Sequence, residues 1–302
     1  MTRRETAVAP AESATGAIYD LGYQGYDGPR LGRRAAFWTL LWASLRAAYG
    51  LGRSGRAKVV PWGLTAFILI PAAVAGAIAA VAPANLSPFN YSNYLWEMQP
   101  LLALFVAAQA PELVSGDQRN HVLSLYFSHA LVRTDYALAK LGALATALFG
   151  LALAPLLVIL VSSILVSADL PAAIGDQIGN LPQVIGSPLI HAIPLAGLGL
   201  AIASWTPRRA YATGAIIALF LVSAAVGGIL AEAGRGRISE VAPLINPFVL
   251  LDGTRDWLLG ATIPDSPVRD AHLAFPVFGL LTLLLAVLGI AAVLWRYRRI
   301  AA

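Results

Sequence analysis

Six long apolar blocks alternate with shorter polar stretches along this chain of 302 residues. A helix of about 20 apolar residues crosses the roughly 30 Å hydrocarbon core of a bilayer. The pattern therefore predicts six transmembrane helices, near residues 60–82, 94–110, 141–166, 185–205, 211–231 and 273–295. The expected fold class is an all-α polytopic membrane protein. The second block is the shortest, and Glu97 and Gln99 lie near its start.

A shorter amphipathic pattern over residues 33–49 precedes the first block. Trp38, Trp42, Leu45 and Tyr49 fall on one stripe of a helix, and arginines flank the segment. Because this helix is too short to span a bilayer, we expect it to lie along the inner leaflet as an amino-terminal interfacial helix.

The residues before the first span divide into two parts. Residues 1–18 contain no apolar run of signal-peptide length and predict a disordered cytoplasmic tail. Residues 19–58 combine a leader rich in glycine and tyrosine with the interfacial helix, and residues 60–302 form the six-span transmembrane domain.

Charge distribution sets the orientation. Only 12% of the residues are charged and 58% are hydrophobic, with a mean hydropathy of +0.70. Seventeen of the 21 Lys and Arg residues lie in the tail and in the loops on its side of the membrane, and four lie on the other side. Basic residues favour the cytoplasmic side, so both termini are expected to be cytoplasmic. The pI near 9.7 then reflects flanks that face anionic lipid, and no nucleic-acid partner is expected.

A charged segment of mixed polarity, residues 111–140, separates the second and third blocks. Pro111 is expected to end the second span, and Gly116 to allow a turn. Residues 120–130 place apolar side chains on one side of a short amphipathic helix. Its shape suits a cytoplasmic surface on which a soluble partner docks, which we term a coupling element. An interfacial helix with lipid contacts only is the alternative.

The chain shows no catalytic signature. It contains neither a His-Glu-x-x-His zinc motif nor a Gly-x-Ser-x-Gly elbow, and without cysteine it has no thiolate metal site. Its two lysines, Lys58 and Lys140, precede Val and Leu, whereas a Walker A motif needs Gly-Lys-Ser/Thr. The chain is therefore not expected to be an enzyme or to hold a cofactor, and any ATP and magnesium would be bound by a partner subunit.

One histidine, His191, falls within a predicted span. An ionisable residue inside a membrane is by default a candidate functional site. Apart from Glu97, however, the predicted spans hold no carboxylate that could form a proton relay with it, so a packing role is favoured. In the outer loop, residues 232–272, the run 249–260 could form a short interfacial helix, either as part of an outer gate or as a simple connector.

The segment 111–140 resembles the region between spans two and three in permease subunits of bacterial ATP-binding-cassette exporters of the type-2 class. The matching residues are Ala110-Pro111-Glu112-Leu113, Asp117, Arg119, Leu123, Leu125-Tyr126, Ser128, Leu131, Arg133, Tyr136 and Lys140. The leader, with Tyr26-Asp27-Gly28-Pro29-Arg30, is similar to the amino-terminal segment of such subunits, and the six-span layout also matches.

The resemblance implies a half-transporter in the bacterial plasma membrane. It would pair with a second permease copy or a paralogue, and two nucleotide-binding subunits would supply ATP hydrolysis. Contact with those subunits is expected at Glu112, Asp117, Arg119, Arg133 and Asp135. The expected activity is export of a hydrophobic or amphipathic cargo, because the spans are apolar. A membrane scaffold without transport activity is the alternative, and an integral membrane enzyme lacks a visible catalytic set.

Overall fold

The computed structural model describes residues 28, 31–81, 91–128, 131–261 and 266–299. The chain divides into two units, Met1–Leu31 and Gly32–Ala302, and every helix of the described residues belongs to the second unit. The expected tail and most of the leader lie outside the described residues.

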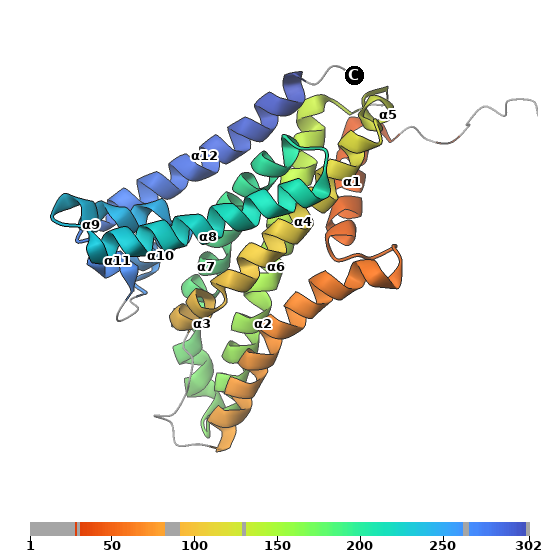
Figure 1. Cartoon of the computed structure of the whole chain (residues 1–302). Helices are drawn as coiled ribbons and strands as arrows, with labels where there is room; N and C mark the ends of the chain where they lie inside the picture. The colour runs from red at the N-terminus through yellow and green to blue at the C-terminus, as the bar shows by residue number, and fades with distance from the viewer. Residues whose placement is uncertain (1–27, 29–30, 82–90, 129–130, 262–265, 300–302) are drawn as a thin grey trace, which may run out of the picture. The chain divides into compact units, whose positions relative to one another are not determined.

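The described part of the second unit contains helices and no strands (Figure 1). In chain order they are α1 (Gly32–Ala48), α2 (Gly55–Val81), α3 (Tyr91–Glu97), α4 (Gln99–Arg119), α5 (Leu123–Ser128), α6 (Arg133–Val166), α7 (Leu170–Ser204), α8 (Arg209–Ala233), α9 (Arg237–Val241), the 3-10 helix η2 (Ala242–Ile245), α10 (Pro247–Leu259), α11 (Pro267–Asp270) and α12 (Phe275–Arg299).

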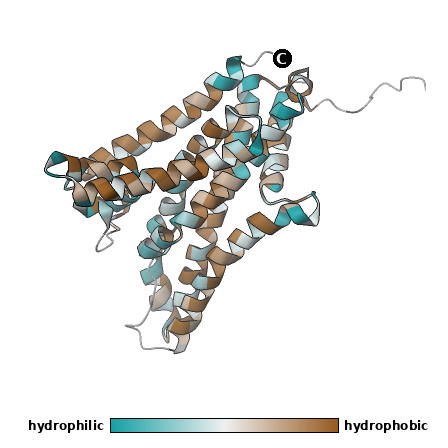
Figure 2. Cartoon of the chain, viewed as in Figure 1, coloured by the Kyte–Doolittle hydropathy of each residue, from teal (hydrophilic) through white to brown (hydrophobic). Residues whose placement is uncertain are grey.

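Five of the described helices are long and apolar enough to cross a membrane: α2, α6, α7, α8 and α12. They correspond to the first, third, fourth, fifth and sixth predicted spans, and they indicate a multi-pass membrane protein. In Figure 2, hydrophobic positions run along these helices, while hydrophilic positions gather at the end of α12, where Arg296, Arg298 and Arg299 form the last turn.

The second predicted span, residues 94–110, covers α3 and the first part of α4. These helices meet at Met98, and Pro100 lies at the start of α4, where a proline needs no backbone donor. Eleven residues of α4 are buried, among them the polar Gln109 and Ser115. A helix in the centre of the bundle faces other helices more than lipid, which explains why α4 is less apolar than its neighbours.

Small residues let the helices approach closely, as expected where lipid gives no hydrophobic drive for helix association. At the crossing of α7 and α12, a Cβ added to Gly289 would lie 2.8 Å from the carbonyl carbon of Gly197. The backbones are therefore in direct contact there. Large apolar side chains such as Leu280, Leu283 and Leu288 point outward from α12 and are exposed in the isolated chain.

The structure corrects the prediction for the segment 111–140. Pro111 does not end a helix, because α4 continues through Pro111 and Gly116 to Arg119. A proline inside a helix is tolerated where neighbouring groups satisfy the carbonyl that loses its donor. The chain turns instead at His121, whose backbone has a φ of 54°, and the short helix α5 follows.

The third predicted span also begins earlier than expected. Helix α6 starts at Arg133, so that Asp135 and Lys140 belong to it instead of leading into it. Asp135 occupies the third helical position, where its carboxylate accepts a hydrogen bond from the backbone N–H of Val132 at 3.4 Å. A carboxylate at this position favours a helix start, because it satisfies a free donor and complements the helix dipole.

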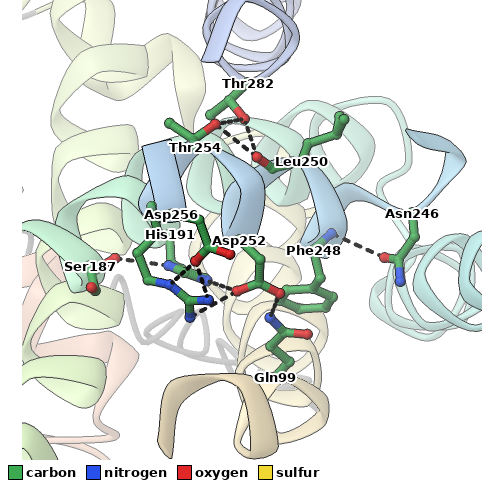
Figure 3. A network of polar contacts seen from close by, with 11 residues as sticks. Gln99, Ser187, His191, Asn246, Phe248, Leu250, Asp252, Thr254, Asp256 and Thr282 are labelled. Atoms are coloured by element: carbon green, nitrogen blue, oxygen red, sulfur yellow. Dashed lines mark hydrogen bonds and ion pairs between the residues drawn. The ribbon is translucent and has the colours of Figure 1, made fainter. Parts of the chain in front are cut away.

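The predicted helix at residues 249–260 is present as α10, but it does not lie with one face free. Every residue from Pro247 to Asp256 is buried. Asn246 caps the helix by accepting from Phe248 N at 3.0 Å, and Gly260 ends it in the left-handed conformation. Thr282 Oγ1 of α12 donates to Leu250 O at 2.9 Å (Figure 3). Helix α10 is thus packed into the bundle.

Candidate functional site

Three carboxylates of the segment 111–140 form ion pairs with distant parts of the chain, and we call Glu112, Asp117, Asp135 and their partners the charged cluster. Asp135, at the start of α6, accepts two hydrogen bonds from Arg33 of α1, at 2.6 Å to Nε and 2.7 Å to Nη2. This paired geometry fixes the orientation of both groups. Because 60% of the Arg33 side chain is exposed, the pair positions α1 against α6 more than it stabilises the fold.

Glu112 of α4 connects three elements through one carboxylate. Arg53, in the loop between α1 and α2, pairs with one of its oxygens, and Arg209, at the start of α8, pairs with the other. Glu112 therefore holds the ends of α2 and α8 against α4.

Asp117, in the last turn of α4, pairs with Lys140 of α6, whose Nζ lies 2.9 Å from Asp117 Oδ2. Tyr136 Oη donates to the same oxygen at 2.7 Å. Lys140 is only 6% exposed, and a buried ammonium requires such a partner because its hydration is lost. The next residue, Gln118, donates to Ser204 O at 2.9 Å and to Tyr297 Oη at 3.1 Å, which joins α4 to the ends of α7 and α12.

The two arginines expected at the partner contact lie nearer the surface. Arg119 is exposed, and Arg133 is half-buried, with Nη1 donating to Arg298 O at 3.4 Å. Leu125 of α5, the short helix that follows α4 in the chain, is 64% exposed. Of the five expected contact residues, Glu112, Asp117 and Asp135 pair with side chains within the chain, Arg133 donates to a backbone carbonyl, and Arg119 is exposed. Their contact with a partner stays a prediction.

A second polar group lies in the bundle around α10, and we call Gln99, His191, Asp252, Arg255 and Asp256 the buried network. Arg255 is 0% exposed. Its Nη1 lies 3.1 Å from Asp252 Oδ1, and its Nη2 lies 2.9 Å from Asp256 Oδ1. Burial raises the pKa of Asp256, and the charge of Arg255 opposes that shift. One guanidinium thus holds two carboxylates of the same helix.

Helices α4 and α7 contribute the other two members. Gln99 Nε2 donates to Asp252 Oδ2 at 2.6 Å. His191 Nδ1 lies 2.8 Å from Ser187 O, which can only accept, so Nδ1 carries the hydrogen. His191 Nε2 faces Asp252 Oδ1 at 3.7 Å (Figure 3). A hydrogen bond thus joins α4 to α10, and the His191 ring of α7 lies against Asp252 in the interior without a hydrogen bond to it.

This arrangement overturns the expectation that only Glu97 could act as a carboxylate partner for His191. The sequence assigns Asp252 to an outer loop, but α10 packs beside α7 and brings the carboxylate to the imidazole. The amphipathic run at 249–260 was the available signal for this helix. Nothing in its periodicity identified His191 as the residue that it meets.

A cavity of about 560 Å³ adjoins the buried network between α4, α8 and α10. Gln99 and Asp252 form part of its wall, together with Trp96, Phe220 and Phe248. The wall is mostly apolar with a few polar groups, which is the usual composition of a small-molecule site. Among the described residues, no group of three or more His, Asp or Glu side chains could hold a metal ion.

No protein-family model matches this chain, and no curated protein matches it significantly. What can be inferred about its activity depends on its residues and on the geometry of the charged cluster, the buried network and the cavity.

Proposed function

We propose that this chain is the permease subunit of a bacterial ATP-binding-cassette exporter of the type-2 class. It resides in the plasma membrane, pairs with a second permease copy or a paralogue, and exports a hydrophobic or amphipathic cargo. A separate nucleotide-binding subunit binds ATP and magnesium and hydrolyses the nucleotide. The resemblance of residues 110–140 to such subunits and the geometry of the charged cluster support this proposal.

In this proposal α4 joins the five other helices as a membrane crossing, and it is the second crossing in chain order. Its 21 residues reach about 31 Å at 1.5 Å per residue, and its last turns, which carry Glu112 and Asp117, extend beyond the hydrocarbon core into the cytoplasmic headgroup region. Both termini are then cytoplasmic, and the charged cluster lies on the cytoplasmic side. Helix α1 runs along the inner leaflet, where its exposed Trp38 and Trp42 suit the region of the lipid headgroups.

The charged cluster is the observation that carries the proposal. Helix α5 connects the end of α4 to the start of α6, and the ion pairs of Glu112, Asp117 and Asp135 join these ends to α1, α2 and α8. A force on α5 or α1 therefore reaches several transmembrane helices at once. A partner that binds one arrangement of these ends more tightly shifts the whole bundle toward it.

In this proposal, docking and transmission are carried out by different residues. Arg119, Leu125 and Arg133 form the outward surface that docks the nucleotide-binding subunit. Asp135 and Glu112 hold the helix ends in register, so that movement of the docked subunit is transmitted instead of being lost in local bending.

The test is reconstitution with a candidate ATP-binding-cassette subunit, sought first among the genes adjacent to this one. Arg119→Ala combined with Leu125→Ser should weaken binding of that subunit at least about fivefold, equivalent to ~1 kcal/mol. Asp135→Asn should leave co-purification intact and lower the ATPase activity of the reconstituted complex, because the amide still caps α6 but cannot pair with Arg33 as an ion. Glu240→Gln, in α9, is the matched control and should behave as the unmodified chain.

Unchanged subunit binding and unchanged ATPase activity in both variants would rule out the coupling role. A stable complex in which ATP hydrolysis moves no apolar cargo across the vesicle membrane would favour the scaffold alternative.

A further inference from the structure

The cavity beside the buried network has the size of a drug-like ligand site. Its volume of about 560 Å³ falls within the roughly 300–1,000 Å³ usual for such sites. Its lining includes Trp96 and Gln99, at the junction of α3 and α4, and Phe220 of α8. Phe248 and Asp252 of α10 also line it.

The charged groups of this wall are of one sign. Glu97 and Asp252 line the cavity, and no lysine or arginine does so among the described residues. The counter-ion of Asp252 is Arg255, which is fully buried and also pairs with Asp256.

The charged residues around the cavity do not cancel the negative charge of its wall. Arg269 of α11 is exposed, and its charge acts on Asp256. With both arginines counted, the carboxylates Glu97, Asp252 and Asp256 still outnumber the guanidiniums. His191 faces Asp252 but does not line the cavity. An anionic ligand would therefore meet like charges in a site with few donors to satisfy it.

Aromatic rings supply a second feature that favours a cation. The rings of Phe220 and Phe248 lie 5.2 Å apart, and Trp96 lines the same space. The face of an aromatic ring attracts an ammonium-type charge, and the attraction grows where water is excluded. Apolar residues such as Leu104 and Ile217 complete the wall and suit a hydrophobic body.

We propose that this cavity binds an organic cation with an apolar body, of the amphiphilic ammonium or phosphonium class. The charge lies between the Glu97 and Asp252 carboxylates and the aromatic rings, and the apolar body packs along α4 and α8. This inference rests on the proposed function, because it assigns the class of cargo that the permease carries.

The test compares two probes of similar size and opposite charge, tetraphenylphosphonium and tetraphenylborate. Binding of each is measured by equilibrium dialysis against the full chain in lipid nanodiscs, with empty nanodiscs subtracted. The phosphonium should bind saturably and the borate should not. Glu97→Gln should weaken phosphonium binding about fivefold, in line with the loss of one partly solvated charge pair.

Two further variants keep the test independent of folding. Ala224→Trp fills the cavity from α8 and should abolish saturable binding, whereas Glu232→Gln, on the same helix but outside the cavity wall, should leave it unchanged. Asp252→Asn should weaken binding by more than tenfold if the variant stays folded. The inference is overturned if borate binds as tightly as phosphonium, or if Ala224→Trp binds phosphonium normally.

The measurement uses the chain without its nucleotide-binding subunit, so the two proposals can fail separately. Loss of the cation preference with normal coupling to the ATPase overturns the cargo class alone. Cation binding in a chain that never couples to the ATPase overturns the permease role and leaves the binding site standing.

Discussion

Replacement of Arg255 by methionine tests the buried network most directly. Arg255 is fully buried and is the cation between Asp252 and Asp256. Methionine keeps much of the volume of the side chain and removes its charge, so that two carboxylates remain in the interior without that cation. Removing one partner of a buried ion pair costs about 3–5 kcal/mol, because the remaining charge stays desolvated. We expect Arg255→Met to lower the free energy of unfolding by this amount.

The assay is equilibrium unfolding in mixed micelles with increasing SDS, followed by tryptophan fluorescence. Arg235→Met, at an exposed position, is the control and should stay within about 0.5 kcal/mol of the unmodified chain. The triple variant Asp252→Asn, Arg255→Met, Asp256→Asn should regain most of the loss, since it leaves no unpaired charge in the interior. The reasoning is refuted if Arg255→Met costs less than about 1 kcal/mol, or if the triple variant is as unstable as the single one.

Two further predictions concern helix packing and pH. Gly289→Ala should lower the free energy of unfolding by about 1–3 kcal/mol, because its Cβ would meet the α7 backbone. Gly214→Ala, with open space around the added Cβ, should raise the free energy of unfolding by about 0.5–1 kcal/mol. Equal effects of the two variants in SDS unfolding would contradict the packing. Burial raises the pKa of Asp256 above its ordinary 3.8, so the folded state holds this proton more tightly than the unfolded state. The free energy of unfolding should therefore fall as pH rises through the interval between these two pKa values, and a titration of Asp256→Asn that kept the same slope would speak against this.

Much of the architecture could be predicted from the sequence, because long apolar runs leave few alternatives in a bilayer. Five predicted spans correspond to helices able to cross a membrane, and the helices at 33–49 and 249–260 are also present. Helix boundaries were less predictable. Helix α7 begins at Leu170, well before the predicted start at residue 185. The predicted start is too late because Asp176, Gln177 and Asn180 lower the hydropathy of a segment that is nonetheless helical. Hydropathy reports compatibility with lipid, whereas backbone hydrogen bonds decide where a helix ends.

The candidate sites depended more on tertiary structure. The sequence alone determined that the segment 111–140 is charged, and that His191 lies in an apolar span. Only the packing of the helices decided that Arg33 reaches Asp135, and that Asp252 reaches His191. Helical periodicity relates residues three or four apart on one face, and it carries no information about which face of another helix lies opposite. Pairs of charges from distant segments are therefore decided by how the helices cross, and in this protein close backbone contact at small residues and the burial of α10 fix those crossings.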